Sequence, residues 1–177
     1  SFADYMSEAL YHPTLGYYNN TAFSLGKQGD FTTAPEISPL FAQCLAQQVH
    51  EILSHLAGAP ILELGAGTGK LAGDLLHYLA MLDSLPDHYY IYEISPALRK
   101  KQHAYLQQTF PQFLDRIHWL DALPTHFTGV IIANEVLDAI PFDCFRVAEN
   151  TILERRVVYE KNQFEWKLES AREELLT

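Results

Sequence analysis

The chain has 177 residues, of which 48% are hydrophobic, and its formal net charge is -10 at pH 7. This length is enough for one domain with its own core, and the hydrophobic fraction excludes a disordered chain. Nucleic acids are bound through clustered Lys and Arg, so a chain with 22 acidic and 12 basic residues is not expected to bind them. The compact basic cluster in the sequence is Arg99, Lys100 and Lys101.

The cysteines, Cys44 and Cys144, form neither a C-x-x-C motif nor a disulfide framework, so we expect two small buried side chains without a redox role. No run approaches the roughly 18 apolar residues of a membrane span. The N-terminus lacks the pattern of a signal peptide. We therefore expect a cytoplasmic chain, although a targeting segment outside it would not be visible. The eight histidines are scattered, and no metal site is expected.

The first part of the chain predicts a short helix at residues 2–10, followed by turns up to Pro35. Ser38 and Pro39 are typical of an N-cap and first helical residue, and a helical period continues to Leu56. An alternation of elements follows, with strands expected at 61–64, 89–94, 117–120 and 129–133, and helices after the first two strands, at about 71–79 and 96–110.

This alternation predicts an α/β fold with a mostly parallel sheet covered on both faces. The link at 121–128 is too short for a full crossover helix. From Ile152 the pattern becomes that of a β-hairpin, in which Phe164, Trp166 and Leu168 share one face.

Ser170 and Glu173 match a capping box, which predicts the start of a further helix. So short a helix is marginal alone, and we expect the chain to stop partway through a larger protein. The expected segments are an N-terminal arm and helix at 1–58, a Rossmann-like core at 59–141, and a hairpin with the start of a helix at 142–177.

The most informative stretch is the turn E-L-G-A-G-T-G-K-L at residues 63–71. A P-loop needs G-x-x-x-x-G-K-[ST], but Leu64 and Leu71 stand at the first glycine and the hydroxyl position. A dinucleotide turn is matched only in part, because Lys70 replaces its third glycine. The pattern that fits is an acid followed by alternate glycines: Glu63, Gly65, Gly67 and Gly69. It resembles the first motif of Rossmann-like S-adenosylmethionine methyltransferases.

This motif suits S-adenosylmethionine because bare backbone lets the sulfonium and methionine part approach closely, and the helix N-terminus can receive the carboxylate. Glu63 can act on the cationic side of the cofactor, through its ammonium. Glu93 ends the second strand, where an acid accepts hydrogen bonds from both ribose hydroxyls, a role that NAD needs as well. Asp121 follows the third strand and either binds the adenine amino group or caps a turn.

Other stretches closely resemble the MidA-like methyltransferase family, over almost the whole chain. They are Y-H-P-T-L-G-Y-Y (11–18), K-Q-G-D-F-T-T-A-P-E-I-S-P-L-F (27–41), E-L-G-A-G-T-G-K-L (63–71), Y-E-I-S-P-A-L (92–98) and A-N-E-V-L-D-A-I-P (133–141). The resemblance implies a Rossmann-like methyltransferase and, for the mitochondrial branch of the family, methylation of a protein arginine. It also implies that the last strands of the methyltransferase sheet lie outside this chain.

The resemblance further implies that residues 29–33 fold over the cofactor, with Asp30 and Thr33 as its polar contacts. The alternative is that Thr33 only caps a helix whose first turn holds Pro35 and Glu36. Three tyrosines of the first matching stretch either form a lid over the acceptor or pin the N-terminal arm to the core: Tyr11, Tyr17 and Tyr18.

N-E-V-L-D at 134–138 follows the fourth strand, at the sheet edge where ligands bind in open α/β folds. Carboxylates grip a planar guanidinium in forked pairs, and a helical turn would put Glu135 and Asp138 on one face. They could orient an arginine while one nitrogen attacks the methyl carbon. The alternative is that Asp138 caps the next segment and only Glu135 or Asn134 lines the cleft.

We therefore predict an S-adenosylmethionine methyltransferase that acts on a protein, such as a respiratory-complex subunit, with arginine as the expected acceptor. A non-catalytic assembly factor that retains the fold is the main alternative, and an NAD-dependent enzyme is a weaker one. The sequence leaves the assembly state open, a homodimer included. A eukaryotic member would be expected in the mitochondrial matrix instead of the cytoplasm.

Overall fold

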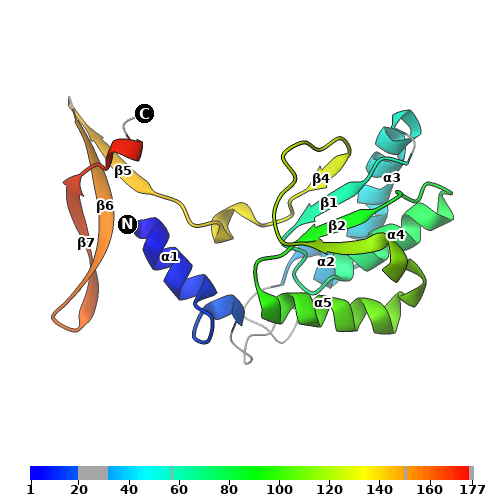
Figure 1. The fold of residues 1–177 in the computed structure, drawn as a ribbon, viewed down its shortest axis with the longest axis horizontal. Helices are drawn as coiled ribbons and strands as arrows, with labels where there is room; N and C mark the ends of the chain where they lie inside the picture. Colours follow the sequence, from blue (N-terminus) through cyan, green and yellow to red (C-terminus); the bar gives the residue numbers. More distant parts are fainter. Residues whose placement is uncertain (20–31, 57, 150, 176–177) are drawn as a thin grey trace. The chain divides into compact units, whose positions relative to one another are not determined.

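The structure, a computed structural model, describes residues 1–19, 32–56, 58–149 and 151–175 (Figure 1). The chain divides into two compact units, which are considered separately. The core unit comprises Tyr18–Val136, and the terminal unit comprises Ser1–Tyr17 together with Leu137–Thr177. No helix in the described part of the chain has both the length and the apolar character needed to cross a bilayer.

The core unit alternates helices and strands as the sequence predicts. Its elements are α2 (Ala34–Ile37), α3 (Leu40–His55), β1 (Ile61–Leu64), α4 (Lys70–Met81), β2 (Tyr89–Tyr92), α5 (Pro96–Thr109), η2 (Pro111–Arg116), β3 (Ile117–Leu120) and β4 (Val130–Ile132). A short 3-10 turn, η1 (Tyr17–Asn19), lies at the junction of the two units. The second and fourth strands are shorter than predicted. As expected, no helix forms between β3 and β4, where residues 121–129 are turns and loop.

The four strands form one parallel sheet in the order β3-β2-β1-β4. Ile61 pairs with Tyr89 on one side and with Val130 on the other. Parallel strands joined by crossover helices place all their carboxyl ends at one edge of the sheet. The turns after β1, β2, β3 and β4 therefore meet at that edge, which is where the predicted site residues lie in the sequence.

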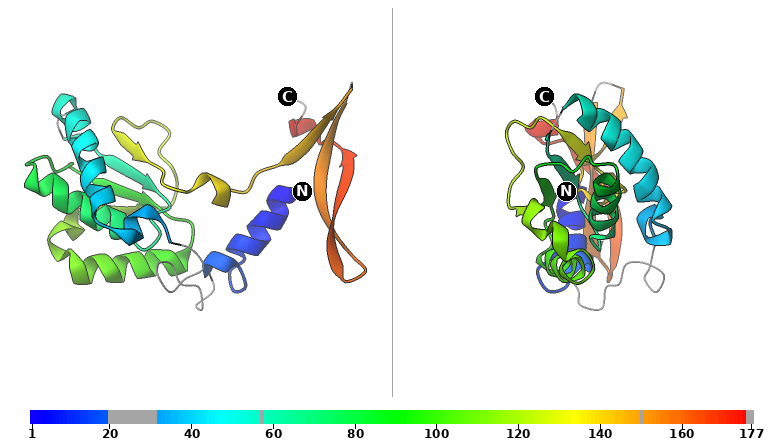
Figure 2. Two further views of the ribbon diagram at one scale, coloured as in Figure 1. Left: turned by 180° about the vertical axis from the view of Figure 1, so that it is seen from behind. Right: turned by 90° about the vertical axis from the view of Figure 1, so that its right-hand side faces the viewer.

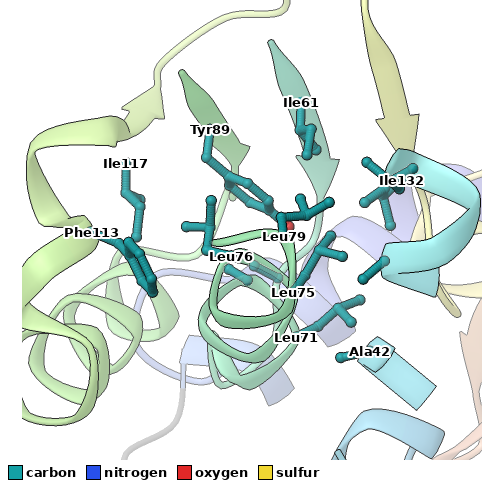
Figure 3. Close-up of a cluster of buried hydrophobic side chains, with 14 of the residues drawn as sticks. Ala42, Ile61, Leu71, Leu75, Leu76, Leu79, Tyr89, Phe113, Ile117 and Ile132 are labelled. Carbon is teal, nitrogen blue, oxygen red and sulfur yellow. The ribbon is translucent and has the colours of Figure 1, made fainter. Parts of the chain in front are cut away.

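One face of this sheet is covered by helices. Ile61, Tyr89 and Ile91 are 0% exposed and belong to one cluster with residues of α3 and α4 (Figure 3). Seen from behind, α3 and α4 lie over the same side of the strands (Figure 2). Leu75, Leu76 and Leu79 complete this layer with 0% exposure. The apolar stripe read from the sequence of α4 is thus its core-facing side.

The opposite face is partly exposed in the described residues, so the expectation that helices cover both faces is wrong for this part of the chain. Tyr90 and His118 are only half-buried there, and Ile131 is 58% exposed. These residues occupy the same register across β2, β3 and β4, so they point to one side of the sheet. Parallel sheets normally carry helices on both faces. In the described residues helices cover one of them, although Leu62 on the other face is itself buried.

The helix starts follow the predicted capping chemistry closely. Ser95 caps α5, since its hydroxyl accepts a hydrogen bond from the Leu98 amide at 3.1 Å and Pro96 is the first helical residue. Ser38 Oγ accepts from the Leu40 amide at 3.2 Å, although α3 begins at Leu40, one residue later than predicted. Such shifts of one residue are common at helix ends.

The terminal unit combines one helix with an antiparallel sheet. Its elements are α1 (Phe2–Tyr11), η3 (Leu137–Ala139), β5 (Cys144–Ala148), β6 (Thr151–Glu160), β7 (Gln163–Ser170) and η4 (Glu173–Leu175), with strand order β5-β6-β7. The hairpin of β6 and β7 confirms the prediction. It turns at Lys161 and Asn162, which both have positive φ values of 50° and 69°, as a type I′ turn requires.

The two faces of this sheet differ in chemistry. Aromatic residues on one face contact α1: the rings of Phe2 and Trp166 lie 5.0 Å apart, and those of Tyr5 and Phe164 lie 5.3 Å apart. Strand alternation puts Glu154 and Arg156 on the other face, where they form an ion pair at 2.9 Å. Alternation predicts this separation, to which Arg155 is an exception because its guanidinium lies 4.4 Å from the centre of the Trp166 ring on the aromatic face.

Three predictions about the terminal residues and cysteines are wrong. Ser170 is not a helix cap but the last residue of β7, where it pairs with Leu153, and Glu173 begins a 3-10 turn. Pairing with β6 continues past Ser170, since the Ala171 amide donates to Ile152 O at 3.3 Å, and this holds the residue in an extended conformation. The sequence also gave no warning of β5. Cys44 is exposed and Cys144 is half-buried, so neither is the small buried residue expected.

Candidate functional site

The glycine turn joins β1 to α4 at the carboxyl edge of the sheet. Gly65, Gly67 and Gly69 have φ values of 63°, 55° and 85°, which lie in the left-handed region. Residues with a Cβ rarely adopt this conformation, so the alternate glycines are required by the turn itself. Gly69 is the N-cap of α4, and the first turn of that helix presents its free amide groups beside the glycines. The turn is a backbone cradle suited to an anionic or bulky ligand group.

Neighbouring segments approach two of these glycines closely. A Cβ on Gly65 would lie 3.3 Å from Val136 Cγ2, so the segment after β4 lies against the start of the turn. A Cβ on Gly69 would lie 3.4 Å from Gln102 Cα, so α5 lies against its end. The turn is therefore held between two elements that follow other strands of the sheet.

Glu93 lies just past the end of β2 and is 7% exposed. Its Oε1 accepts from the Ser95 amide at 2.9 Å, and its Oε2 accepts from Gln102 Nε2 at 3.0 Å. The Ile94 backbone amide also acts on this carboxyl. A carboxylate has about four acceptor positions, so these donors do not use all of them. Burial raises the pKa of Glu93, while these hydrogen bonds and the charge of Arg99 oppose the rise. The residue is a rigid, buried acceptor at the position predicted for ribose.

Glu63 lies within β1 and is 2% exposed. The Tyr89 hydroxyl donates to its Oε2 at 2.9 Å. Burial raises the pKa of Glu63 to about 7, and the nearby charge of Glu93 adds to the rise. No ion pair involves Glu63 in the described structure. A buried carboxyl without a cation is poised to accept one, such as an ammonium.

Asp121 lies directly after β3, as predicted. Its side chain is 91% exposed, and its Oδ1 accepts from Arg99 Nη1 at 2.7 Å. Arg99 Nη2 also donates to Leu120 O at 3.3 Å, which ties α5 to the end of β3. The structure thus adds an ion pair to the two roles considered for Asp121.

The segment before α3 lies against the glycine turn through a carboxylate. The Thr68 hydroxyl donates to Glu36 Oε1 and accepts from the Lys70 amide at 3.2 Å. Thr33 occupies the N-cap position of α2 but makes no capping hydrogen bond with its side chain, so the simple capping role is not supported. Asp30 lies outside the described residues. Lys70 is half-buried and pairs with Asp74, so it is not the exposed residue that its position suggests.

The acceptor residues follow β4. Asn134 is half-buried and Glu135 is exposed with a φ of 52°, while Asp138 is exposed within the 3-10 turn η3. Because Glu135 precedes η3 in a left-handed conformation, no single helical turn contains both carboxylates. Asn134 and Glu135 belong to the core unit and Asp138 to the terminal unit.

Tyr11 and the backbone of Tyr18 each form a hydrogen bond that attaches the N-terminal segment to its own unit. The Tyr11 hydroxyl donates to Ala139 O at 2.7 Å in the terminal unit. In the core unit, Ser95 Oγ lies 2.9 Å from Tyr18 O and 2.8 Å from Asn19 Oδ1, and its single proton serves one of them at a time. Residue 18 is thereby attached to the segment that follows Glu93.

Among the described residues, no group of three or more His, Cys, Asp or Glu side chains could hold a metal ion. His88 Nδ1 and His118 Nε2 lie 3.1 Å apart, but they are two residues without a third ligand. The site is therefore described by its backbone turn and carboxylates.

Sequence reasoning missed three polar features of this region. Gln102 is fully buried beside the glycine turn, Tyr89 holds Glu63, and Thr68 with Glu36 joins α2 to the turn. The sequence pattern could have indicated that Gln102 is buried, because it stands four residues from both Leu98 and Leu106 in the buried stripe of α5. The other contacts join residues more than 25 positions apart, and no local pattern marks them.

The fold and the site together define a class. A parallel sheet in the order β3-β2-β1-β4, a positive-φ glycine turn after β1 and a buried acid after β2 are features of a Rossmann-like nucleoside-binding domain. The turn lacks the first glycine and the hydroxyl residue of a P-loop, because Leu64 and Leu71 stand there, and Lys70 replaces the third dinucleotide glycine, which leaves the methyltransferase type.

Residues 44–176 match a family described as S-adenosyl-L-methionine-dependent methyltransferases. The match covers well over half of the chain, and the chain belongs to this family. S-adenosylmethionine is the cofactor of the family, and the residues present fit it: Gly65, Gly67 and Gly69 have no Cβ to obstruct a sulfonium, and Glu93 keeps acceptor capacity for a ribose.

Solved structures and named relatives agree with this assignment. A Burkholderia thailandensis protein bound to S-adenosyl-homocysteine is 41% identical, with a TM-score of 0.85 over 98% of this chain and 46% of that one. The mitochondrial protein arginine methyltransferase NDUFAF7 of Danio rerio is 31% identical over 85% of this chain and 41% of its own length. The Drosophila melanogaster homologue is 32% identical over 78% and 37%. The chain thus spans less than half the length of these relatives.

Proposed function

We propose that this chain is the cofactor-binding part of an S-adenosylmethionine-dependent methyltransferase that methylates a protein arginine. The observation that carries the proposal is the buried carboxylate of Glu93 beside the positive-φ glycine turn. The two features lie after adjacent strands, so one nucleoside ligand can contact both. The family match and the neighbour solved with S-adenosyl-homocysteine support the same ligand.

In this proposal the glycines Gly65, Gly67 and Gly69 receive the methionine part, and α4 offers its amide groups to the carboxylate. Glu93 accepts both ribose hydroxyls. Two acids act at the ends of the cofactor: Glu63 on its ammonium and Asp121 on its adenine amino group. Asp30 and Thr33 cover it from the segment before α2.

The acceptor arginine is held after β4. In the core unit, Asn134 and Glu135 supply a carboxamide and a carboxylate, which suit a planar guanidinium, and Asp138 in the terminal unit stays a prediction from the sequence. The close approach of Val136 to Gly65 supports this placement, because it brings the segment after β4 to the methionine end of the cofactor. Methyl transfer needs mainly alignment of the attacking nitrogen with the methyl carbon in a dry site.

The partner in this proposal is a protein and not a nucleic acid, as the net charge of -10 favours. The named relatives are mitochondrial protein arginine methyltransferases. By analogy, a eukaryotic protein of this kind would work in the mitochondrial matrix on a respiratory-complex subunit, and a bacterial one in the cytoplasm. A homodimer is to be tested by its mass in solution.

Calorimetric titration of the chain with S-adenosylmethionine, S-adenosyl-homocysteine and NAD tests the cofactor. We expect the first two ligands to bind and NAD to fail. Glu93→Ala should weaken both by roughly 100-fold, since two hydrogen bonds to a charged group are lost. Glu51→Ala, an exposed residue on α3, serves as the control. NAD binding in place of S-adenosyl-homocysteine would contradict the proposal.

Incubation with methyl-labelled cofactor and a protein extract, followed by acid hydrolysis, tests the acceptor. The label should appear in methylarginine, and Glu135→Gln should reduce it about 100-fold or more, because the carboxylate that grips the guanidinium is neutralised. A folded chain that binds S-adenosyl-homocysteine but transfers no methyl group would favour the alternative, a non-catalytic assembly factor with the same fold.

A further inference from the structure

A glutamine is fully buried where α5 contacts the glycine turn. Gln102 is 0% exposed, and its Cα would lie 3.4 Å from a Cβ on Gly69. It follows Leu98 and precedes Leu106 by four residues, so it occupies the middle of the buried stripe of the helix. An amide in such a stripe costs free energy unless its polar atoms are paired. Its presence therefore calls for partners.

Gln102 makes three hydrogen bonds to three different segments. Its Nε2 donates to Gly67 O at 3.1 Å and to Glu93 Oε2 at 3.0 Å. Its Oε1 accepts from Trp119 Nε1 at 2.9 Å. The partners belong to the turn after β1, the end of β2 and β3 itself. One side chain thus connects three neighbouring strands near their carboxyl ends.

The chemistry of these partners permits one orientation of the amide. A carbonyl and a carboxylate only accept, and an indole nitrogen only donates. The nitrogen of Gln102 must therefore face Gly67 and Glu93, and the oxygen must face Trp119. No other uncharged side chain of this size offers two donors and an acceptor. Leu or Met would fill the volume but remove all three hydrogen bonds.

We propose that Gln102 is a positioning residue, which holds the Glu93 carboxylate against the glycine turn and leaves its remaining acceptor positions directed to the ribose hydroxyls. The ribose contact itself rests on the proposed function. The positioning of Glu93 by Gln102 rests on the hydrogen bonds alone. The two statements can therefore be tested separately.

Other charged groups also act on Glu93 and set the background for such a test. Arg99 on α5 lowers the pKa of Glu93, and the carboxyl of Glu63 on β1 interacts with it. Arg99 is itself paired with Asp121 after β3. Variants of Gln102 leave these groups in place, so a change in Glu93 can be assigned to the amide.

The first measurement needs no ligand. Carboxyl carbon NMR should follow the titration of Glu93 in the unmodified chain, in Gln102→Met and in Gln107→Met, an exposed glutamine on the same helix. Removing a donor to the ionised form disfavours that form, so the pKa of Glu93 should rise in Gln102→Met. It should be unchanged in Gln107→Met. An unchanged pKa in a folded Gln102→Met chain would overturn the proposal.

The second measurement is a titration with S-adenosyl-homocysteine at a temperature well below unfolding of each variant. Gln102→Met should lower the affinity about 10- to 100-fold, as expected for a lost hydrogen bond to a charged group. In a Glu93→Ala background the same change should cost less than about 3-fold, because the carboxylate to be positioned is absent. Equal losses in both backgrounds would show a general structural role and overturn the proposal.

The isosteric variant Gln102→Glu guards against a simple packing effect. At pH 8 a second carboxylate would face Glu93 and Gly67 O, and affinity should fall. On acidification the new carboxyl becomes protonated and donates again, so affinity should recover towards pH 6. Gln102→Met should show no such recovery, and recovery in both variants would contradict the proposal. If the unmodified chain does not bind S-adenosyl-homocysteine, the proposed function fails, while the NMR titration still decides the role of Gln102.

Discussion

The two units bury carboxylates in opposite ways. In the terminal unit, Glu154 is 0% exposed and lies 2.9 Å from Arg156 and 3.1 Å from Arg172. In the core unit, Glu63 and Glu93 are 2% and 7% exposed and have neutral donors within hydrogen-bond distance. One unit neutralises its buried charge with two guanidinium groups. In the described residues of the other unit, neither Glu63 nor Glu93 forms an ion pair, although the charge of Arg99 still lowers the pKa of Glu93.

This difference separates structural from functional burial. A buried charge with its counter-ions serves the fold, and the unit is destabilised when a partner is removed. A buried carboxyl without a counter-ion costs free energy in the folded chain, which is tolerated where a ligand supplies the missing partner. The cation of S-adenosylmethionine and its ribose hydroxyls are such partners. Three substitutions test whether the comparison holds.

The largest effect is expected from Glu154→Ala in the terminal unit. The change leaves Arg156 and Arg172 without their shared partner, and breaking a buried ion pair costs about 3–5 kcal/mol of unfolding free energy. The loss should fall near the lower end, because Glu169 and Asp143 still contact these arginines. Urea unfolding measures the change.

The two tryptophans make this measurement specific, since Trp119 lies in the core unit and Trp166 in the terminal unit. With Trp119→Phe as the background, fluorescence reports on the terminal unit through Trp166. Glu160→Ala, an exposed residue on the same strand, is the matched control and should change little. A loss below about 1 kcal/mol for Glu154→Ala would break the comparison.

Glu63→Gln should have the opposite effect on stability and raise the unfolding free energy. Burial raises the pKa of Glu63 from 4.5 to about 7, so between these values the unfolded chain has released a proton that the folded chain still holds. The unfolding free energy therefore falls as pH rises through this window and stays reduced above it. In Glu63→Gln the neutral amide removes the cost of burying a charge, and its oxygen can still accept the hydrogen bond from the Tyr89 hydroxyl. We expect the unfolding free energy to increase by about 2–3 kcal/mol at pH 8 and hardly at all at pH 4.5.

Thermal or urea unfolding at these two pH values measures the gain, with the exposed Glu51→Gln as control. The same variant should bind S-adenosyl-homocysteine more weakly, because the carboxylate that faces the ammonium is neutralised. Higher stability combined with lower affinity would sharpen the comparison. Lower stability at pH 8 would show that Glu63, like Glu154, serves the fold.

The smallest effect on stability is expected from Asp121→Asn. The side chain is 91% exposed, and its ion pair with Arg99 is of the surface type. Such pairs contribute little, so the unfolding free energy should change by less than about 0.5 kcal/mol. Affinity for S-adenosyl-homocysteine should nevertheless fall about 10-fold if Asp121 accepts from the adenine amino group. Calorimetric titration measures this affinity, with Asp115→Asn, a change at an exposed residue, as the control. Unchanged affinity in Asp121→Asn would show that Asp121 is only a surface residue that pairs with Arg99.

The local features of the core unit could be predicted from the sequence. The glycine turn, the strand that precedes it and the caps of α5 depend on neighbouring residues and their backbone preferences. The hairpin was predicted for the same reason, since alternation and the Lys161–Asn162 turn are local. The helix predicted after Ser170 does not form, because pairing of β7 with β6 overrides a weak capping signal. The strand β5 and the exposure of Cys44 likewise depend on distant packing.

The sequence by itself determined the fold class, the methyltransferase motif and the positions of Glu63 and Glu93, because alternating periodicity and glycine spacing are encoded locally. Only the tertiary structure decided what surrounds those carboxyls. Tyr89 reaches Glu63 from the next strand, and Gln102 reaches Glu93 from the following helix. Whether a buried acid has a cation, a neutral donor or a free acceptor position depends on residues brought together by packing. That choice sets its pKa and, with it, its role.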